Sequence, residues 1–281
     1  MKQLSLKSRL KDYEFSDWTR PWVTLSVGVA SMSAKVKTVD WGNFTPINKS
    51  IAYRLIYRSF GWDKVGKNHF GYTMPSPIVG LYLDPAGTKG VVEKFIEGYN
   101  GGPKKEIREI QYRFNKKWDD QDKAKEVRDQ WIKDYQHGLT IAKSIQIDES
   151  ELWELCRFAE WGRESNKGQE YGPLNGMYRG LIQDAFDASV NLQLVQKVKV
   201  KWVKGESTDQ MEPMGFKQAG NIVQVSLEHR YDPDETENER FKVKIVNARQ
   251  NTSVWGQEFT NLSFGELGQL VYPDSQESDW Q

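Results

Sequence analysis

The sequence predicts an α+β protein in which twisted antiparallel sheets pack against helices. Three observations support this fold class. Val-rich segments with alternating apolar residues recur along the chain, as in 22–30 and 241–248, which is typical of strands. Other segments, such as 124–135, have apolar residues at helical spacing. The 281 residues are 38% hydrophobic and 28% charged, as in ordinary globular proteins.

The first half of the chain is expected to form one α+β unit over residues 1–162. Its strands are expected at 22–30, 36–41, 78–83 and 139–147. Helices are expected from Val91 to Ile96, over 124–135 and from Asp148 onwards. Residues 107–114 fit a helix or a strand, because their apolar residues match both periods.

The second half is expected to be rich in strands. Residues 163–176 are polar and Gly-rich, which indicates a loop or a domain boundary. The C-terminal unit, 177–272, is expected to begin with a short helix at 177–190 and to end with a helix at 264–271. Its strands are expected at 192–203, 220–230, 241–248 and 254–260. Residues 273–281 form an acidic tail without an apolar run, so we expect residues 274–281 to be mobile.

Two segments share a strand that runs directly into a helix. In 147–155 and 262–270, Asp148 and Ser263 stand at the N-cap, and Glu151 and Glu266 follow three residues later as capping-box partners. Leu then occupies the same two positions in both segments. The chain is therefore expected either to contain two related strand-to-helix units or to use a capping box that is common in α+β proteins.

The segment QEFTNLSFGELGQLV, residues 257–271, resembles the strand-to-helix ending of the Whirly and positive-cofactor-four families. Residues 144–158 resemble the same ending more weakly. The resemblance implies a β-sheet surface that binds single-stranded nucleic acid and that oligomerisation completes.

A first group of candidate binding residues lies in the stretch 49–72, which interleaves basic and aromatic side chains. Such a mixture suits single strands, because rings stack on bases while cations follow the backbone. The candidates are Tyr53, Arg54, Tyr57, Arg58, Trp62, Lys64, Lys67, Phe70 and Tyr72. Alternatively, Tyr53, Tyr57 and Phe60 lie along one helix face and belong to the core.

A second group consists of lysines on expected strands. The two-residue period of a strand places Lys197, Lys199 and Lys201 on one face. Lys242 and Lys244 alternate in the same way with apolar residues. If the two strands are neighbours, five ammonium groups share one face and suit a phosphate backbone. Otherwise, these lysines form the solvated face of a half-buried sheet.

The sequence contains no evident catalytic or metal-binding constellation. The segment Gly61-x4-Gly66-Lys67 resembles a P-loop, but Asn68 follows where a P-loop has Ser or Thr, and no helix is expected at 69–77. The three histidines lack metal-ligand spacing, and the single Cys excludes a disulfide within the chain and a multi-Cys zinc site. We expect no catalytic residue, no metal and no cofactor.

These observations favour binding over catalysis. The first hypothesis is a cytoplasmic, oligomeric single-stranded DNA-binding protein of replication or recombination, such as a phage encodes. Its acidic tail, 273–281, would recruit replication proteins. The alternative is a structural protein, such as a virion component, whose Trp-rich surfaces are subunit interfaces. A nuclease is a weaker third reading. No apolar run approaches the roughly 20 residues that span a bilayer.

Overall fold

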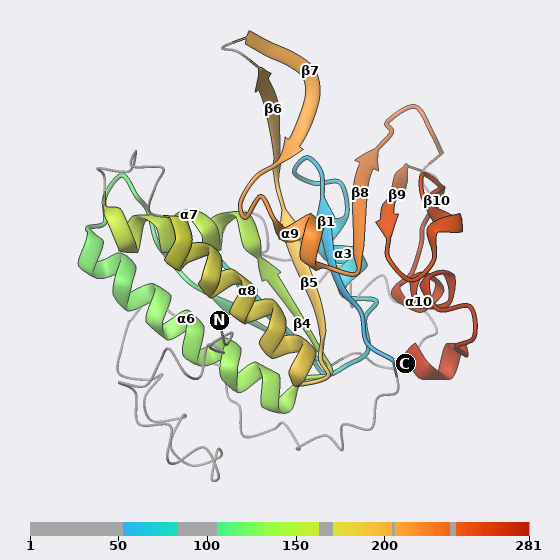
Figure 1. The fold of residues 1–281 in the computed structure, drawn as a ribbon, viewed down its shortest axis with the longest axis horizontal. Coiled ribbons are helices and arrows are strands. Elements are labelled where there is room, and N and C mark those ends of the chain that lie inside the picture. The colour runs from blue at the N-terminus through green and yellow to red at the C-terminus, as the bar shows by residue number, and fades with distance from the viewer. Residues whose placement is uncertain (1–52, 84–105, 163–170, 204–205, 237–239, 281) are drawn as a thin grey trace.

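The computed structural model describes residues 53–83, 106–162, 171–203, 206–236 and 240–280. Within these residues, strands and helices form one mixed eight-stranded sheet with helices on both faces, and a separate two-stranded hairpin (Figure 1). The α+β class is therefore confirmed. The strands expected at 22–30 and 36–41, and the helix expected at 91–96, lie outside the described residues.

The strands of the large sheet run in the order β10-β9-β8-β1-β5-β4-β2-β3. Their bounds are β1 Ile56–Phe60, β2 Ile78–Tyr82, β3 Ile107–Gln111, β4 Ser144–Asp148, β5 Asn191–Gln196, β8 Val225–Tyr231, β9 Phe241–Ala248 and β10 Glu258–Thr260. The ambiguous segment at 107–114 therefore contains a strand.

The pairing of these strands corrects the expected antiparallel sheet. All neighbours from β8 to β3 pair in parallel, and only β8 with β9 and β9 with β10 are antiparallel. Strands β2, β4 and β5 are buried along their whole length, as expected for parallel strands covered on both faces. Strands on both sides of the expected boundary at 163–176 are hydrogen-bonded neighbours, since β4 pairs with β5.

Helices cover the two faces of this sheet. Their bounds are α3 Lys67–Gly71, α6 Gln121–Ile141, α7 Glu149–Trp161, α8 Tyr171–Asp187, α9 Ala219–Ile222 and α10 Phe264–Val271, with 3-10 turns η3 Thr252–Val254 and η4 Glu277–Trp280. Residues 171–176, expected to be a loop, belong to α8. None of the described helices is both long and apolar enough to cross a membrane.

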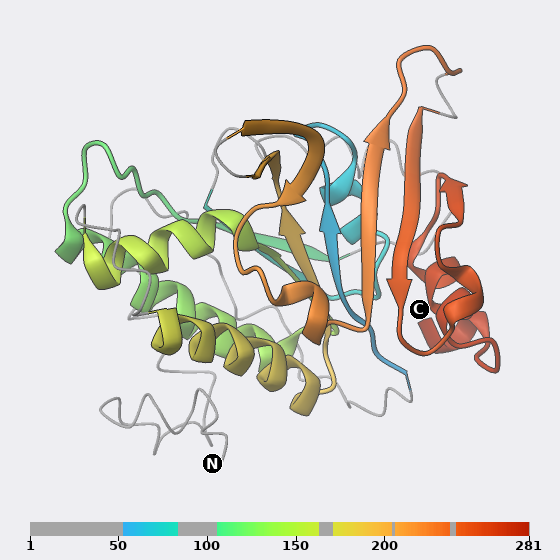
Figure 2. The ribbon, with the colours of Figure 1, turned by 45° about the horizontal axis from the view of Figure 1, so that its top comes forward.

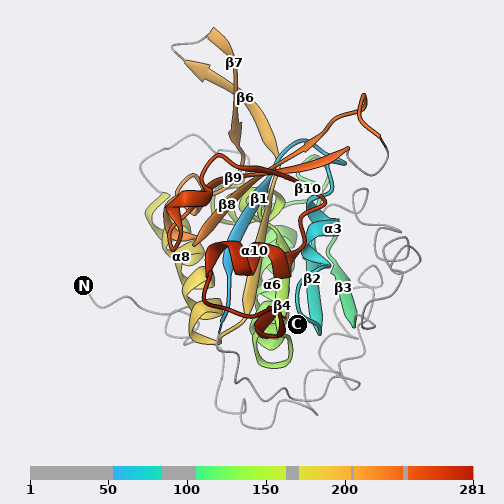
Figure 3. The same cartoon turned by 90° about the vertical axis from the view of Figure 1, so that its right-hand side faces the viewer.

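Two apolar cores lie on opposite faces of the sheet. The first contains Ile56 of β1 with side chains of α6, α7 and α8. The second contains Tyr57, the next residue of β1, with Phe70 of α3 and Phe264 of α10. This division follows from the alternation of side chains along a strand. In Figure 2 the green and yellow helices α6 to α8 and the red C-terminal helices lie on opposite sides of the strands, and Figure 3 shows α3 and α10 from their own side.

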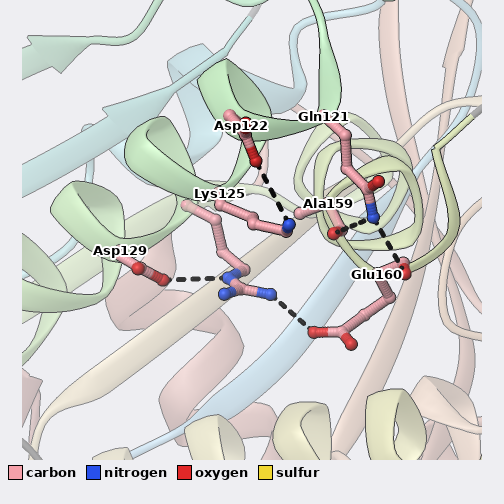
Figure 4. Close-up of polar contacts among 7 residues, drawn as sticks. Gln121, Asp122, Lys125, Asp129, Ala159 and Glu160 are labelled. Atoms are coloured by element: carbon pink, nitrogen blue, oxygen red, sulfur yellow. Dashed lines mark hydrogen bonds and ion pairs between the residues drawn. The ribbon is translucent and has the colours of Figure 1, made fainter.

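Polar contacts join the ends of α6 and α7 (Figure 4). The side-chain amide of Gln121 donates to the carbonyl oxygens of Ala159 and Glu160 at 3.0 and 3.1 Å. These carbonyls belong to the last turn of α7, where no N–H group of the helix donates to them. The guanidinium of Arg128 forms an ion pair with Glu160 at 2.5 Å. Residues far apart in the sequence thus fix the packing of this helix pair.

The two expected capping boxes differ in outcome. At α10 the box is confirmed, because the Ser263 hydroxyl accepts from the N–H of Glu266 and the Glu266 carboxylate accepts from the N–H of Ser263. At α7 it is wrong, since Asp148 makes no side-chain capping bond and Glu151 instead pairs with Lys197 at 2.8 Å. The two strands also differ, because β4 is a central parallel strand and β10 an antiparallel edge strand.

The expected mobile tail is packed onto the fold over residues 274–280. Trp280 is 2% exposed, and its indole N–H donates to the Ser275 hydroxyl at 2.8 Å. Its ring contacts those of Tyr53, Phe264 and Tyr272. Asp274 is exposed, whereas the Asp279 carboxylate accepts from the N–H of Gln276 at 2.8 Å, so the segment is held around a buried aromatic anchor.

Candidate functional site

The carboxyl ends of β1, β4, β5 and β8 lie at one edge of the sheet, because these strands are parallel. The chain leaves β1 into α3, on the face of the second core, whereas the chain leaving β5 reaches Phe216 and α9, on the face of the first core. Neighbouring strands whose connections leave to opposite faces open a crevice at their carboxyl ends, where open α/β sheets bind ligands. Residues at this edge are therefore the first candidates for a site.

The loop of residues 61–66 joins β1 to α3 at this edge. Gly61 lies against the backbone of β8, where an added Cβ would sit 2.3 Å from the carbonyl oxygen of His229. Lys64 and Gly66 have positive φ angles of 66° and 85°, which turn the chain sharply into α3. No helix was expected at 69–77 from the sequence, and α3 corrects that expectation. With five residues, the helix is too short to produce a helical period.

Backbone N–H groups gather where the loop meets α3. Among the described residues, no protein group accepts a hydrogen bond from the N–H of Gly66, Lys67 or Asn68. Successive N–H groups around a left-handed residue form a concave nest that binds anions, as in P-loops. Gly66 supplies the left-handed residue. The backbone of this segment can therefore accept an anionic group.

The side chain of Lys67 folds back across the loop. It is 7% exposed, and its ammonium donates to the carbonyl oxygens of Gly61 at 2.8 Å and Trp62 at 2.5 Å. Burial lowers the pKa of this ammonium to about 8, against the opposing effect of the carboxylates of Asp63 and Asp148. Because an ammonium has three N–H donors, one remains for a ligand.

Polar side chains from three strands hold α3 in place. The amide of Gln193 on β5 donates to the carbonyl oxygen of Lys67 at 3.0 Å and to the Ser59 hydroxyl at 2.8 Å. His229 on β8 hydrogen-bonds the same hydroxyl at 3.0 Å. Burial, together with the charge of Lys67, lowers the pKa of His229 to about 3, so this imidazole is neutral. The loop thus rests on a buried, uncharged polar layer.

Two acidic residues, Asp148 and Glu149, lie where β4 ends and α7 begins. Asp148 lies close enough to raise the pKa of Lys67. Glu149 is fully buried, and its carboxylate accepts from the N–H of Phe216 and from the amide of Gln196, both at 2.7 Å. Burial raises the pKa of Glu149 to about 7. Within the described ranges, no three His, Cys, Asp or Glu side chains are grouped as metal ligands.

A cleft of about 1260 Å³ opens beside the loop. It lies between residues 61–65, the ends of β1 and β8, and the hairpin that follows β5. Arg58, Trp62 and Tyr231 line it, and Trp62 is 54% exposed. The cleft therefore combines a cation and aromatic rings next to the anion-binding nest.

The hairpin consists of β6 Val198–Val203 and β7 Glu206–Pro213, which pair only with each other and project beyond the large sheet (Figure 1). The first turn of α7 holds both of its ends. The hydroxyl of Ser150 accepts from the N–H of Lys197 at 3.0 Å and donates to the carbonyl oxygen of Met214 at 3.4 Å. Trp202 on the hairpin is 65% exposed.

The structure separates the candidates at 53–72 into three groups: those buried in the core, those packed against other side chains, and those near the loop and cleft. Tyr57, Phe70 and Tyr72 are buried and cannot stack on a base, because they form the core beneath the sheet. Tyr53 packs against Trp280, and the Arg54 guanidinium lies 3.8 Å from the Phe186 ring centroid. Arg58, Trp62, Lys64 and Lys67 are the candidates that reach the loop and cleft.

The lysine candidates do not share one sheet face. Lys199 and Lys201 lie on the hairpin, whereas Lys242 and Lys244 lie on β9 of the large sheet. Lys197 is paired with Glu151, Lys199 with Glu212 at 3.3 Å, and Lys242 with Glu235 at 2.9 Å. The expected field of five neighbouring ammonium groups is therefore wrong, since the two segments belong to different sheets.

Several site residues had no assigned role in the sequence analysis. They are the nest residues Gly66 and Asn68, the supports Gln193 and His229, and Tyr231 in the cleft. The spacing Gly61-x4-Gly66-Lys67 was the available signal.

Together, fold and site define an α+β protein with a glycine-containing strand-loop-helix at the carboxyl edge of its parallel strands. No protein-family model matches the chain, and no curated protein matches it either. Function is therefore argued from the site.

Proposed function

We propose that the protein binds the phosphate groups of a nucleotide at residues 61–68. One observation carries the proposal: the N–H groups of Gly66 to Asn68 have no acceptor among the described residues, in a loop whose first carbonyl oxygens are bound by the Lys67 ammonium. The motif spacing and the position after a parallel strand are those of a P-loop, whose amides cradle phosphates and whose lysine contacts them. A nucleoside triphosphate suits a nest and an ammonium on one loop.

We further propose that binding occurs without hydrolysis. A P-loop uses the hydroxyl after its lysine to hold Mg²⁺. Asn68 stands at that position, and its side-chain oxygen accepts from the Gln146 amide at 3.3 Å. The Glu149 carboxylate already accepts hydrogen bonds from the N–H of Phe216 and from the side-chain amide of Gln196. The protein is thus proposed as a binder of nucleotide whose affinity does not require Mg²⁺.

Calorimetric titration with ATP, in the presence of Mg²⁺ and of EDTA, tests this proposal. We expect the wild type to bind in both conditions without releasing phosphate. Lys67→Met should weaken binding about tenfold or more, because a hydrogen bond to a charged group contributes roughly 1.5–3 kcal/mol. The control is Lys125→Met, which removes a lysine on α6. Failure of the wild type to bind, or equal affinities for Lys67→Met and wild type, would refute the proposal.

Single-stranded DNA binding in replication or recombination is a second candidate function. The observation that favours it is the projecting hairpin, where Trp202 is 65%, Val203 45% and Met211 44% exposed. Exposed rings on a projecting element suit stacking on unpaired bases. The residues 198–213 contain three lysines and three acids, so stacking rather than net charge would supply the affinity. The same surface would serve a structural protein as a subunit interface.

A further inference from the structure

An exposed aromatic pair lies at the ends of β8 and β9, next to the phosphate-binding loop. Tyr231 and Phe241 are opposite each other in the antiparallel register, and their ring centroids are 5.3 Å apart. Tyr231 is 43% and Phe241 38% exposed. Neither ring belongs to the two buried cores. The pair therefore presents aromatic surface that the fold itself does not use.

The position of this pair relative to the loop is fixed by a close contact. An added Cβ on Gly66 would sit 3.0 Å from Cδ1 of Phe241, so the Phe241 ring lies directly against the loop. Tyr231 lines the cleft that residues 61–65 also line. Phe241 thus contacts the loop at Gly66, and Tyr231 carries the aromatic surface from there to the cleft.

We infer that Tyr231 and Phe241 form the base-binding part of the nucleotide site, so that the ligand is a nucleotide rather than a simple polyphosphate. This inference rests on the proposed function of residues 61–68. Every purine or pyrimidine base offers a flat face that can stack on an aromatic ring. The cleft, at about 1260 Å³, exceeds the 300–1,000 Å³ typical of small-molecule sites and accommodates a nucleoside with its phosphates.

The experiment compares ATP with inorganic tripolyphosphate, which carries the phosphates without the base. Both are titrated into the full chain as wild type and as Tyr231→Ala, Phe241→Ala and the double variant. Each ring should contribute about 5- to 150-fold to ATP affinity, and none to tripolyphosphate affinity. Tyr231→Phe should retain ATP affinity, because it keeps the ring. Trp118→Ala, which removes another exposed ring, is the control.

The outcomes separate this inference from the proposed function. If the alanine variants bind ATP like the wild type, or lose both ligands equally, the inference is overturned while phosphate binding stands. If the wild type binds neither ligand, both fail. If the variants lose affinity for a single-stranded oligonucleotide and not for ATP, the pair belongs to a nucleic-acid surface, which also overturns the inference. Melting temperatures near that of the wild type verify that the variants fold. If the double variant is unfolded, the single variant Tyr231→Ala is used to decide the test.

Discussion

Lys67 carries its charge in a buried position, so the proposed nucleotide binding should depend on pH. Burial lowers the pKa of its ammonium to about 8, while Asp63 and Asp148 oppose that shift and Lys197 adds to it. A bound phosphate favours the charged form, so its presence raises the pKa again. Below pH 8 the lysine already holds its proton. Above pH 8 binding must take up a proton.

We therefore predict that ATP affinity is constant below pH 8 and falls above it, by at most about tenfold per pH unit. Titration calorimetry between pH 6.5 and 9.5 measures this profile. In Lys67→Arg the guanidinium stays charged over this range, so any affinity that the variant retains should not vary with pH. A wild-type affinity that is flat up to pH 9.5 would show that Lys67 does not contact the ligand as an ammonium.

Single residues also show how far sequence alone determines the site. Trp62 and Phe70 both stand beside glycines, and both were candidates for stacking on bases. Trp62 is exposed on the loop, whereas α3 turns the Phe70 ring toward Tyr57 and His229. Phe70 is buried because its ring contacts His229, which is more than a hundred residues away in the sequence. No local sequence pattern contains such a contact.

At the scale of elements, the hairpin β6-β7 is the part whose role is most open to experiment. Stacking on a base contributes roughly 1–3 kcal/mol per ring. We predict that Trp202→Ala weakens binding of a single-stranded oligonucleotide by this amount without changing the melting temperature, since Trp202 lies outside both cores. Fluorescence anisotropy across a salt series measures the effect, and Trp118→Ala again serves as the control.

A different result would reassign the hairpin. If Trp202→Ala leaves oligonucleotide binding unchanged but alters the oligomeric state in analytical ultracentrifugation, the hairpin is a subunit interface. The stacking proposal then fails, and the structural alternative gains support.

Elements with a clear period were predicted well, and those without one were not. The apolar faces of α6 and α10 and the alternation in β9 led to helices and a strand near their observed bounds. By contrast, α3 has only five residues, and β4 and β5 alternate polar with apolar residues although both of their faces are buried, so their pattern is that of half-exposed antiparallel strands. Parallel pairing depends on long-range crossovers, and the loop at 61–66 depends on that pairing for its position.

At the scale of the whole molecule, the C-terminal segment closes the second core. Trp280 packs against Tyr53, Phe264 and Tyr272 and so joins the two ends of the described chain. We predict that Trp280→Ala lowers the free energy of unfolding by roughly 3–5 kcal/mol, as expected when a buried aromatic side chain is removed. Urea denaturation measures this change.

The control for this prediction is Trp118→Ala. Trp118 is 74% exposed, so its removal should change the free energy of unfolding by no more than about 0.5 kcal/mol. Equal stabilities of Trp280→Ala and the wild type would mean that the segment is not packed in solution, as the sequence first suggested.

The edge strand β10 has a consequence for how copies of this protein can associate. It is three residues long, Glu258–Thr260, and both of its end residues are exposed. An uncovered strand edge invites another chain to continue the sheet, and natural proteins prevent this with short strands and charged side chains. At β10, a second copy could pair with only a few backbone groups, and these lie beside the Glu258 carboxylate. Assembly by continuation of the sheet is therefore disfavoured at the β10 edge.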